Sequence, residues 1–145
     1  MTSEDKHEKV LFIVQVGDST DHEIESIWTK PTERGYLIDN IPFYATGVAY
    51  GDTVSIIEND GQKYANEIIE VSGHSTLRIW FNDETYVSVT RNELQQLGCS
   101  SEISDQPKLV AVDVPPDVDY QKVQAYLDIG FKSGRWDYEE ACLGF

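Results

Sequence analysis

A histidine and a serine, His74 and Ser75, stand side by side in the segment SGHSTLR. A nucleophilic hydroxyl or thiol needs a base within hydrogen-bond reach and a third group that orients the base. Asp39, Asp52 and Cys99 are possible companions, but adjacency in the chain does not establish that geometry. The sequence also has no G-x-S-x-G elbow and no phosphate-binding glycine loop. We therefore assign no catalytic residues and interpret His74 as a turn residue.

A polar pocket between the two halves of the chain is the alternative. Its walls would come from turns and from one strand, and the candidates are Asp39, Asn40, Tyr50, His74 and Arg78. A pocket in which such groups converge would favour a small enzyme or a ligand-binding domain. Turn chemistry is the simpler account of the Asp-Asn and Gly-Asp pairs, and the pocket stays open as the alternative.

Metal and cofactor chemistry has little support in the sequence. The two cysteines, Cys99 and Cys142, are far apart and show no zinc-type spacing. The three histidines do not pair at a ligand spacing. We expect no metal, no cofactor and two buried or half-buried thiols.

The charge balance is strongly acidic. The chain has 145 residues, with 26 acidic against 11 basic ones and a formal net charge of −15. Such a surface repels nucleic acid and anionic lipid, because binding to phosphates needs clustered Lys and Arg. It attracts basic proteins and speeds their capture, although solubility alone is another reason for the charge.

Two groups of acids are candidates for contact with a basic partner. They are Asp18, Asp21, Glu23 and Glu25 near the second predicted strand, and Asp137, Glu139 and Glu140 near the end of the chain. The first group could instead protect an edge strand from aggregation. The sequence favours a non-catalytic binding protein, specifically an immunity-type inhibitor that neutralises a basic toxin protein.

The first half of the chain, residues 9–74, is predicted to be mostly β. Strands are expected at 9–16, 22–30, 36–40 and 63–71, with a further strand at the end of 41–57. In 22–30, Ile24 and Trp28 alternate with Glu25 and Ile27. The Asp60-Gly61 pair predicts a tight hairpin. We expect a strongly bent antiparallel sheet or a partial barrel.

The second half, residues 75–145, is predicted to be a ferredoxin-like split β-α-β unit. Strands are expected at 75–81 and 109–115. Thr90 and Glu93 have the spacing of a capping box, and Gly98 fits a helix C-terminus. Residues 83–90 fit either strand or helix. The whole chain is expected to be one compact α+β domain, 1–145.

A second helix and a helical tail complete this prediction. Asp119 is expected to cap the helix, whose apolar face comprises Val123, Tyr126, Leu127, Gly130 and Phe131. The spacing of Asp137 and Glu140 fits another capping box, so the segment GRWDYEEACLGF is interpreted as a docked helical turn. Its residues Trp136, Tyr138 and Leu143 are expected to be largely buried.

No apolar run approaches the length of a membrane helix. The first apolar stretch, VLFIVQV, is short and lacks the basic region of a signal peptide. We expect a cytoplasmic protein.

Five stretches together resemble a known family: LIDNIPFYATGVAYGDTV, SGHSTLR, LGC, AVDVPPDVDY and GRWDYEEACLG. They are similar to a bacterial family catalogued as a domain of unknown function (number four-two-six-five). The resemblance covers roughly residues 23–144, and the motifs are long and in order. It implies no chemistry, because the family has no assigned activity.

Overall fold

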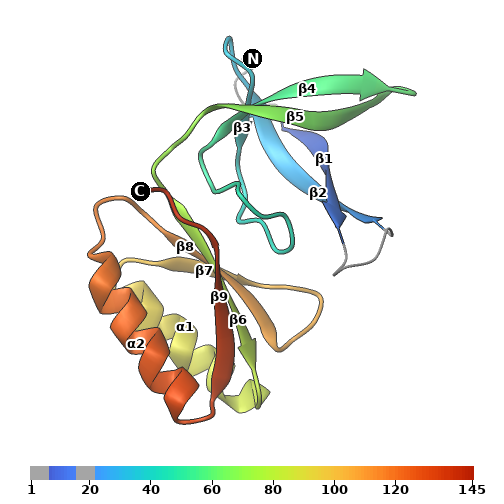
Figure 1. Ribbon diagram of the computed structural model, residues 1–145. Helices are drawn as coiled ribbons and strands as arrows, with labels where there is room; N and C mark the ends of the chain where they lie inside the picture. The colour runs from blue at the N-terminus through green and yellow to red at the C-terminus, as the bar shows by residue number, and fades with distance from the viewer. Residues whose placement is uncertain (1–6, 16–21) are drawn as a thin grey trace.

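The computed structural model describes residues 7–15 and 22–145. A small β-barrel lies above a four-stranded sheet, and two helices cover the face of this second sheet that points away from the barrel (Figure 1). The protein is thus a mixed α+β structure, as predicted. Within the described residues, no helix is long and apolar enough to cross a membrane.

The first sheet is formed by five consecutive strands. They are β1 (Glu8–Gln15), β2 (His22–Pro31), β3 (Tyr36–Ile38), β4 (Thr53–Asn59) and β5 (Gln62–Glu70). Each strand pairs antiparallel with the next, and β1 meets β5 in parallel at Leu11 and Tyr64, which closes a barrel. The predicted bent antiparallel sheet is confirmed.

The β4–β5 hairpin turns at Asp60 and Gly61. Their φ angles are 51° and 78°, and the flanking Asn59 and Gln62 are paired. Two central residues with positive φ match the type of tight turn that an Asp-Gly pair favours.

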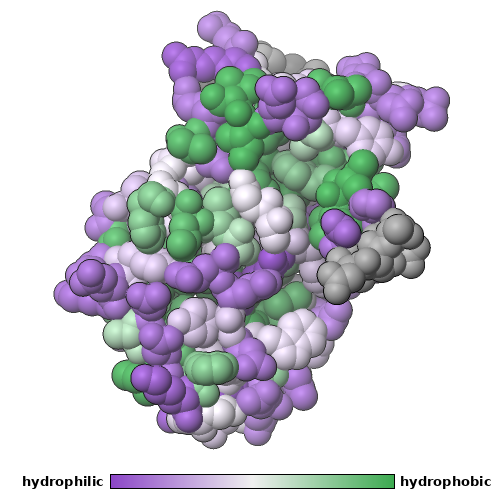
Figure 2. All heavy atoms as spheres, viewed as in Figure 1, coloured by the Kyte–Doolittle hydropathy of each residue, from purple (hydrophilic) through white to green (hydrophobic). Residues whose placement is uncertain are grey.

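The side chains of strand β2 alternate between the inside and the outside of the barrel. Ile27 and Thr29 are fully buried and Glu25 is nearly so, whereas Ile24 and Trp28 are exposed. The predicted period of two is therefore confirmed, and Ile27 packs with Ile38 in the barrel core. In Figure 2, hydrophobic residues on the visible face gather mainly over the barrel half.

The second sheet has the strand order β7-β8-β6-β9, with all neighbours antiparallel. Its elements are β6 (Ser75–Phe81), a 3-10 turn (Glu84–Tyr86), α1 (Val87–Gln96), β7 (Ser100–Ile103), β8 (Leu109–Val114), α2 (Tyr120–Lys132) and β9 (Trp136–Cys142). In β6, Leu77, Ile79 and Phe81 belong to the core beneath the helices. By alternation, Arg78 and Trp80 face the barrel.

The start of the first helix differs from the prediction. Asp83 caps a 3-10 turn by accepting from Thr85 N at 2.9 Å, so residues 84–96 are helical and the ambiguity over 83–90 is resolved as helix. Thr90 is not an N-cap: it lies inside α1 and is buried against the core. Gly98, with φ of 99°, does follow the helix end as predicted.

The second helix follows the prediction closely. Asp119 accepts a hydrogen bond from Gln121 N at 3.1 Å, which confirms the cap. Val123, Leu127 and Gly130 are buried. Phe131 is 53% exposed, because the buried face is centred nearer Gly130, and Phe131 lies at its edge.

The predicted helical tail is wrong: residues 136–142 form the strand β9, paired with β6. Asp137 therefore caps no helix. Trp136 is buried as expected and its Nε1 donates to Leu127 O at 3.0 Å. Tyr138 is half-buried, but Leu143 is 43% exposed, because it lies beyond the end of the strand.

Candidate functional site

The long connection between β3 and β4, residues 39–52, lies between the barrel and the second sheet (Figure 1). Three hydrogen bonds join it to the sheet: Gly47 N to Ala141 O at 3.1 Å, Thr76 Oγ1 to Val48 O at 3.3 Å, and an Arg78 guanidinium N–H to Phe43 O at 2.6 Å. These bonds fix the loop against one face of the sheet. A groove can therefore form between fixed walls.

Glu25 anchors the same loop from the barrel side. Its carboxylate accepts hydrogen bonds from the backbone N–H groups of Phe43, Tyr44 and Ala45 at 2.7, 3.0 and 2.7 Å. The residue is only 9% exposed. Because its charge is buried and already satisfied, Glu25 is not part of an acidic surface, and its assignment to a partner-binding face is wrong.

A groove of about 550 Å³ lies between the loop, β2 and the barrel-facing side of the second sheet. Its walls include the aromatic side chains of Phe43, Tyr44 and Trp80. Trp80 and Tyr44 are partly exposed, so aromatic surface is available to a ligand. The groove is a largely apolar trough with charged groups at its walls.

The charged groups of the groove are Glu23 from β2, Arg78 from β6, and Asp137 and Glu139 from β9. Arg78 is 8% exposed, and its Nε lies 2.6 Å from Glu139 Oε1. That N–H is not aligned for a hydrogen bond, so the contact is ionic. With Arg78 paired to Glu139, Glu23 and Asp137 are the lining charges that no ion pair balances within the part of the chain that the structure describes.

Three of the seven acids singled out in the sequence thus line one groove. Glu140 points to the opposite, helix-covered side of the sheet, where it accepts a hydrogen bond from the Tyr120 hydroxyl. Asp18 and Asp21 lie outside the described residues. Sequence reasoning missed the aromatic wall. The available signal was that Arg78 and Trp80 are two residues apart on one strand, so their side chains share a face.

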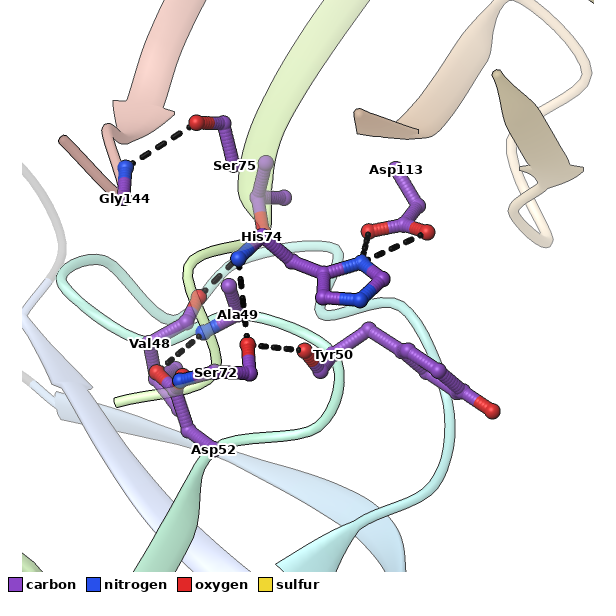
Figure 3. A network of polar contacts seen from close by, with 10 residues as sticks. Val48, Ala49, Tyr50, Asp52, Ser72, His74, Ser75, Asp113 and Gly144 are labelled. Carbon is purple, nitrogen blue, oxygen red and sulfur yellow. Dashed lines mark hydrogen bonds and ion pairs between the residues drawn. The ribbon is translucent and has the colours of Figure 1, made fainter. Parts of the chain in front are cut away.

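The predicted polar pocket does not form as one site, because Arg78 lies in the groove and His74 elsewhere. His74 Nδ1 contacts both carboxylate oxygens of Asp113, at 2.9 and 3.1 Å (Figure 3). The Tyr50 ring meets the imidazole edge with 5.5 Å between centroids. Burial, followed by the charges of Asp39 and Asp113, raises the pKa of Tyr50.

The other members of that pocket have structural partners. Asp39 pairs with His7 Nε2 at 2.6 Å, and Asn40 Oδ1 accepts from Trp28 N at 2.6 Å. Asp52, which was a possible companion of His74 and not a pocket residue, accepts from Ala49 N and Ser72 N at 2.9 and 2.8 Å. Only the contact of Asp52 with Ala49 N is local turn chemistry; the partners of Asp39 and Asn40 are distant in the sequence.

The candidate nucleophiles are not activated. Ser75 is buried and its hydroxyl oxygen accepts from Gly144 N at 2.9 Å. Burial, with a smaller effect of Asp113, raises the pKa of Cys99 to about 11. Both cysteines are free. Among the residues that the structure describes, no group of three His, Cys, Asp or Glu side chains could hold a metal ion.

Asp113 was not singled out in the sequence. It is the polar residue within the buried strand LVAVDV, and that contrast was the available signal. Burial raises the pKa of its carboxyl group, while the hydrogen bond and charge of His74 act in the opposite direction.

Comparison with known proteins supplies the fold and the family. The chain is similar to the solved structure described as "Novel crystal structure of a hypothetical protein from Neisseria gonorrhoeae", with 21% identity and a TM-score of 0.80. The match covers 97% of this chain and 99% of that one, and at this identity it shows the fold alone. No curated protein matches significantly. The model of one family, described as a domain of unknown function (DUF4265), matches residues 25–138. The chain therefore belongs to the DUF4265 family.

Proposed function

We propose that this protein is a non-catalytic binding protein whose groove takes a cationic segment of a basic partner. One observation carries the proposal: Glu23 and Asp137, far apart in the sequence, line the same aromatic groove. Among the described residues that line it, the one base, Arg78, is already paired to Glu139. The groove therefore offers carboxylates to a ligand of positive charge.

The walls suit the side chain of a lysine or arginine. Such side chains combine an apolar stem with a charged head, and the head is attracted to the face of Trp or Tyr. Trp80 and Tyr44 supply aromatic surface, and Glu23 and Asp137 supply charge. The net charge of −15 adds long-range attraction for a basic protein.

In its most specific form, the proposal is an immunity-type inhibitor that neutralises a basic toxin protein in the cytoplasm. Toxins that act on nucleic acid need a basic surface, and an acidic inhibitor can occupy that surface. We also propose that the C-terminal half is ferredoxin-like, supported by its β-α-β-β-α-β succession and its strand order.

A titration with a basic peptide tests the binding site. The probe is a fluorescent seven-residue peptide in which Lys alternates with Val, and the test variant is E23Q/D137N. The control is E33Q/E102Q, which removes the same charge from exposed acids outside the groove lining. Each exposed charge pair contributes about 0.2–1 kcal/mol, so E23Q/D137N should weaken binding roughly 2- to 30-fold.

The control variant should bind within about twofold of the wild type at moderate salt, because charges beyond the Debye length are screened. Equal losses in the two variants would show that only net charge matters, and the groove would then lose its support. The more specific proposal, an inhibitor of a basic toxin, needs a second test. A basic toxin domain that binds the protein must lose its activity on titration, and E23Q/D137N must shift that inhibition curve.

A ligand-binding or enzymatic site at His74 is the second candidate. It is favoured by the Asp113–His74 contact at 2.9 Å, since a carboxylate that holds one imidazole nitrogen fixes the orientation of the other. A His74→Ala variant that loses a measurable small-ligand interaction while keeping its stability would support this candidate. An unchanged interaction would remove it.

A further inference from the structure

We propose that the outer edge of β9 binds the basic partner segment as an added β-strand, through main-chain hydrogen bonds. This inference rests on the proposed function and specifies how the segment docks. The groove acids Asp137 and Glu139 both lie on β9, which is the end strand of the four-stranded sheet. One wall of the groove is therefore also a sheet edge.

The pairing register identifies the main-chain groups at this edge. Asn82 N donates to Arg135 O at 2.9 Å, and the register pairs Trp80 with Asp137 and Arg78 with Glu139. Antiparallel pairing alternates between residues that bond to the partner strand and residues that point away from it. The N–H and C=O groups of Trp136, Tyr138 and Glu140 accordingly point away from β6.

At the opposite edge of the same sheet, a side chain already occupies a main-chain group. This edge is formed by β7, where the Arg91 guanidinium donates to Ser101 O and Ser101 Oγ, both at 2.9 Å. Arg91 thereby occupies a main-chain acceptor of β7. At β9 the corresponding contact is Gly47 N to Ala141 O, at the far end of the strand. Trp136 is itself buried, so residues 137–140 remain, among the residues that the structure describes, as the accessible length.

Acidic side chains lie on both sides of this edge. Asp137 and Glu139 are on the groove side. On the helix side, Glu140 contacts the Tyr120 hydroxyl, and Asp128 of α2 accepts a hydrogen bond from Tyr138. A strand paired with β9 would place alternate side chains opposite each set. Lysine or arginine at those positions would gain opposite-charge pairs along the strand.

The same acids determine which occupant is favoured. Charged residues on an edge strand oppose pairing with a like strand. A second copy of this chain would bring an equally acidic β9, with like charges facing each other. A basic extended segment meets no such repulsion. Charge complementarity therefore favours a basic strand from the partner as the occupant of this edge.

Backbone N-methylation of the peptide tests strand addition without altering the protein. An added strand presents every second N–H to its neighbour, and a methyl group there removes a hydrogen bond and obstructs the approach. Two versions of the Lys-Val peptide carry three N-methyl groups each, one set on the Lys residues and one on the Val residues. One version should lose at least tenfold in affinity, and the other should stay within about threefold of the parent.

Amide hydrogen exchange locates the contact on the protein. With saturating parent peptide, the amides of Tyr138 and Glu140 should exchange at least tenfold more slowly, and those of β7 should not change. Equal losses for the two methylated peptides, or no protection in β9, would overturn strand addition while leaving the groove in place. If the parent peptide does not bind, or binds E23Q/D137N as tightly as the wild type, the proposed function fails and strand addition fails with it.

Discussion

Arg78 on β6 and Glu139 on β9 are cross-strand neighbours whose Nε and Oε1 atoms lie 2.6 Å apart. The same guanidinium donates to Phe43 O at 2.6 Å, so one side chain links both strands to the loop that faces them. Arg78 thus belongs to the frame of the groove. Its positive charge is balanced by Glu139, and the groove keeps the charges of Glu23 and Asp137 for a ligand.

Replacing Glu25 should destabilise the protein, although the change is to a neutral side chain of similar size. Glu25→Gln weakens three charge-assisted hydrogen bonds to the loop, and we expect a loss of about 2–4 kcal/mol in the free energy of unfolding. Urea denaturation measures the loss. Glu23→Gln on the same strand is the control and should change stability by less than about 0.5 kcal/mol. Equal stabilities of the two variants would contradict the anchoring role.

Gly130→Ala should also be destabilising. Alanine normally stabilises a helix interior by about 1 kcal/mol relative to glycine. Here an added Cβ would lie 1.9 Å from Trp136 Cζ2, and the indole is held by its hydrogen bond to Leu127 O. Overpacking should outweigh the helix gain and lower the stability by roughly 1–3 kcal/mol. A raised melting temperature would show that Trp136 can move aside.

Thermal unfolding should be one cooperative transition. The loop between β3 and β4 bonds to both halves: to Glu25 in the barrel, and to Thr76, Arg78 and Ala141 in the second sheet. Loss of either half would remove the partners of this buried backbone. Calorimetry should give equal calorimetric and van't Hoff enthalpies. Two separated transitions would show that the halves are independent domains.

Asp113 should contribute a specific pH dependence. Burial raises its pKa in the folded state above the ordinary value of 3.8, despite the opposing effect of His74. Between those two pKa values the folded state binds more protons than the unfolded state, so this group favours folding more as the pH falls. The stability of the wild type relative to D113N should therefore rise as the pH falls through that window. Urea denaturation of both proteins from about pH 7 to pH 4 measures the difference, and a constant difference would contradict the raised pKa.

Local chemistry predicted those elements whose partners are near in sequence. The Asp60-Gly61 turn and the Asp119 cap depend on neighbouring residues, and both were found. The tail was misassigned because the spacing of Asp137 and Glu140 fits a capping box as well as a strand. The alternation of Trp136 and Tyr138 with Asp137 and Glu139 was the competing signal, and pairing with β6 decided between them.

The candidate site was predictable only in part for a similar reason. Composition indicated acids for a basic partner, but not which acids share a surface. Glu25 looked like Glu23 in the sequence, and only the loop that folds over it shows that its charge is used internally. The groove joins β2 to β9, and no local pattern brings those strands together.

A charge exchange between Asp137 and the peptide tests the central claim most directly. D137K should lose affinity for the Lys-Val peptide and gain affinity for a Glu-Val peptide of the same length, each by about tenfold, because the new lysine faces the bound segment. E33K carries the same change of net charge at an exposed position outside the groove lining. Its affinities for the two peptides should each stay within about twofold of those of the wild type. If E33K and D137K change both affinities equally, the peptide is not bound in the groove, and the account is contradicted.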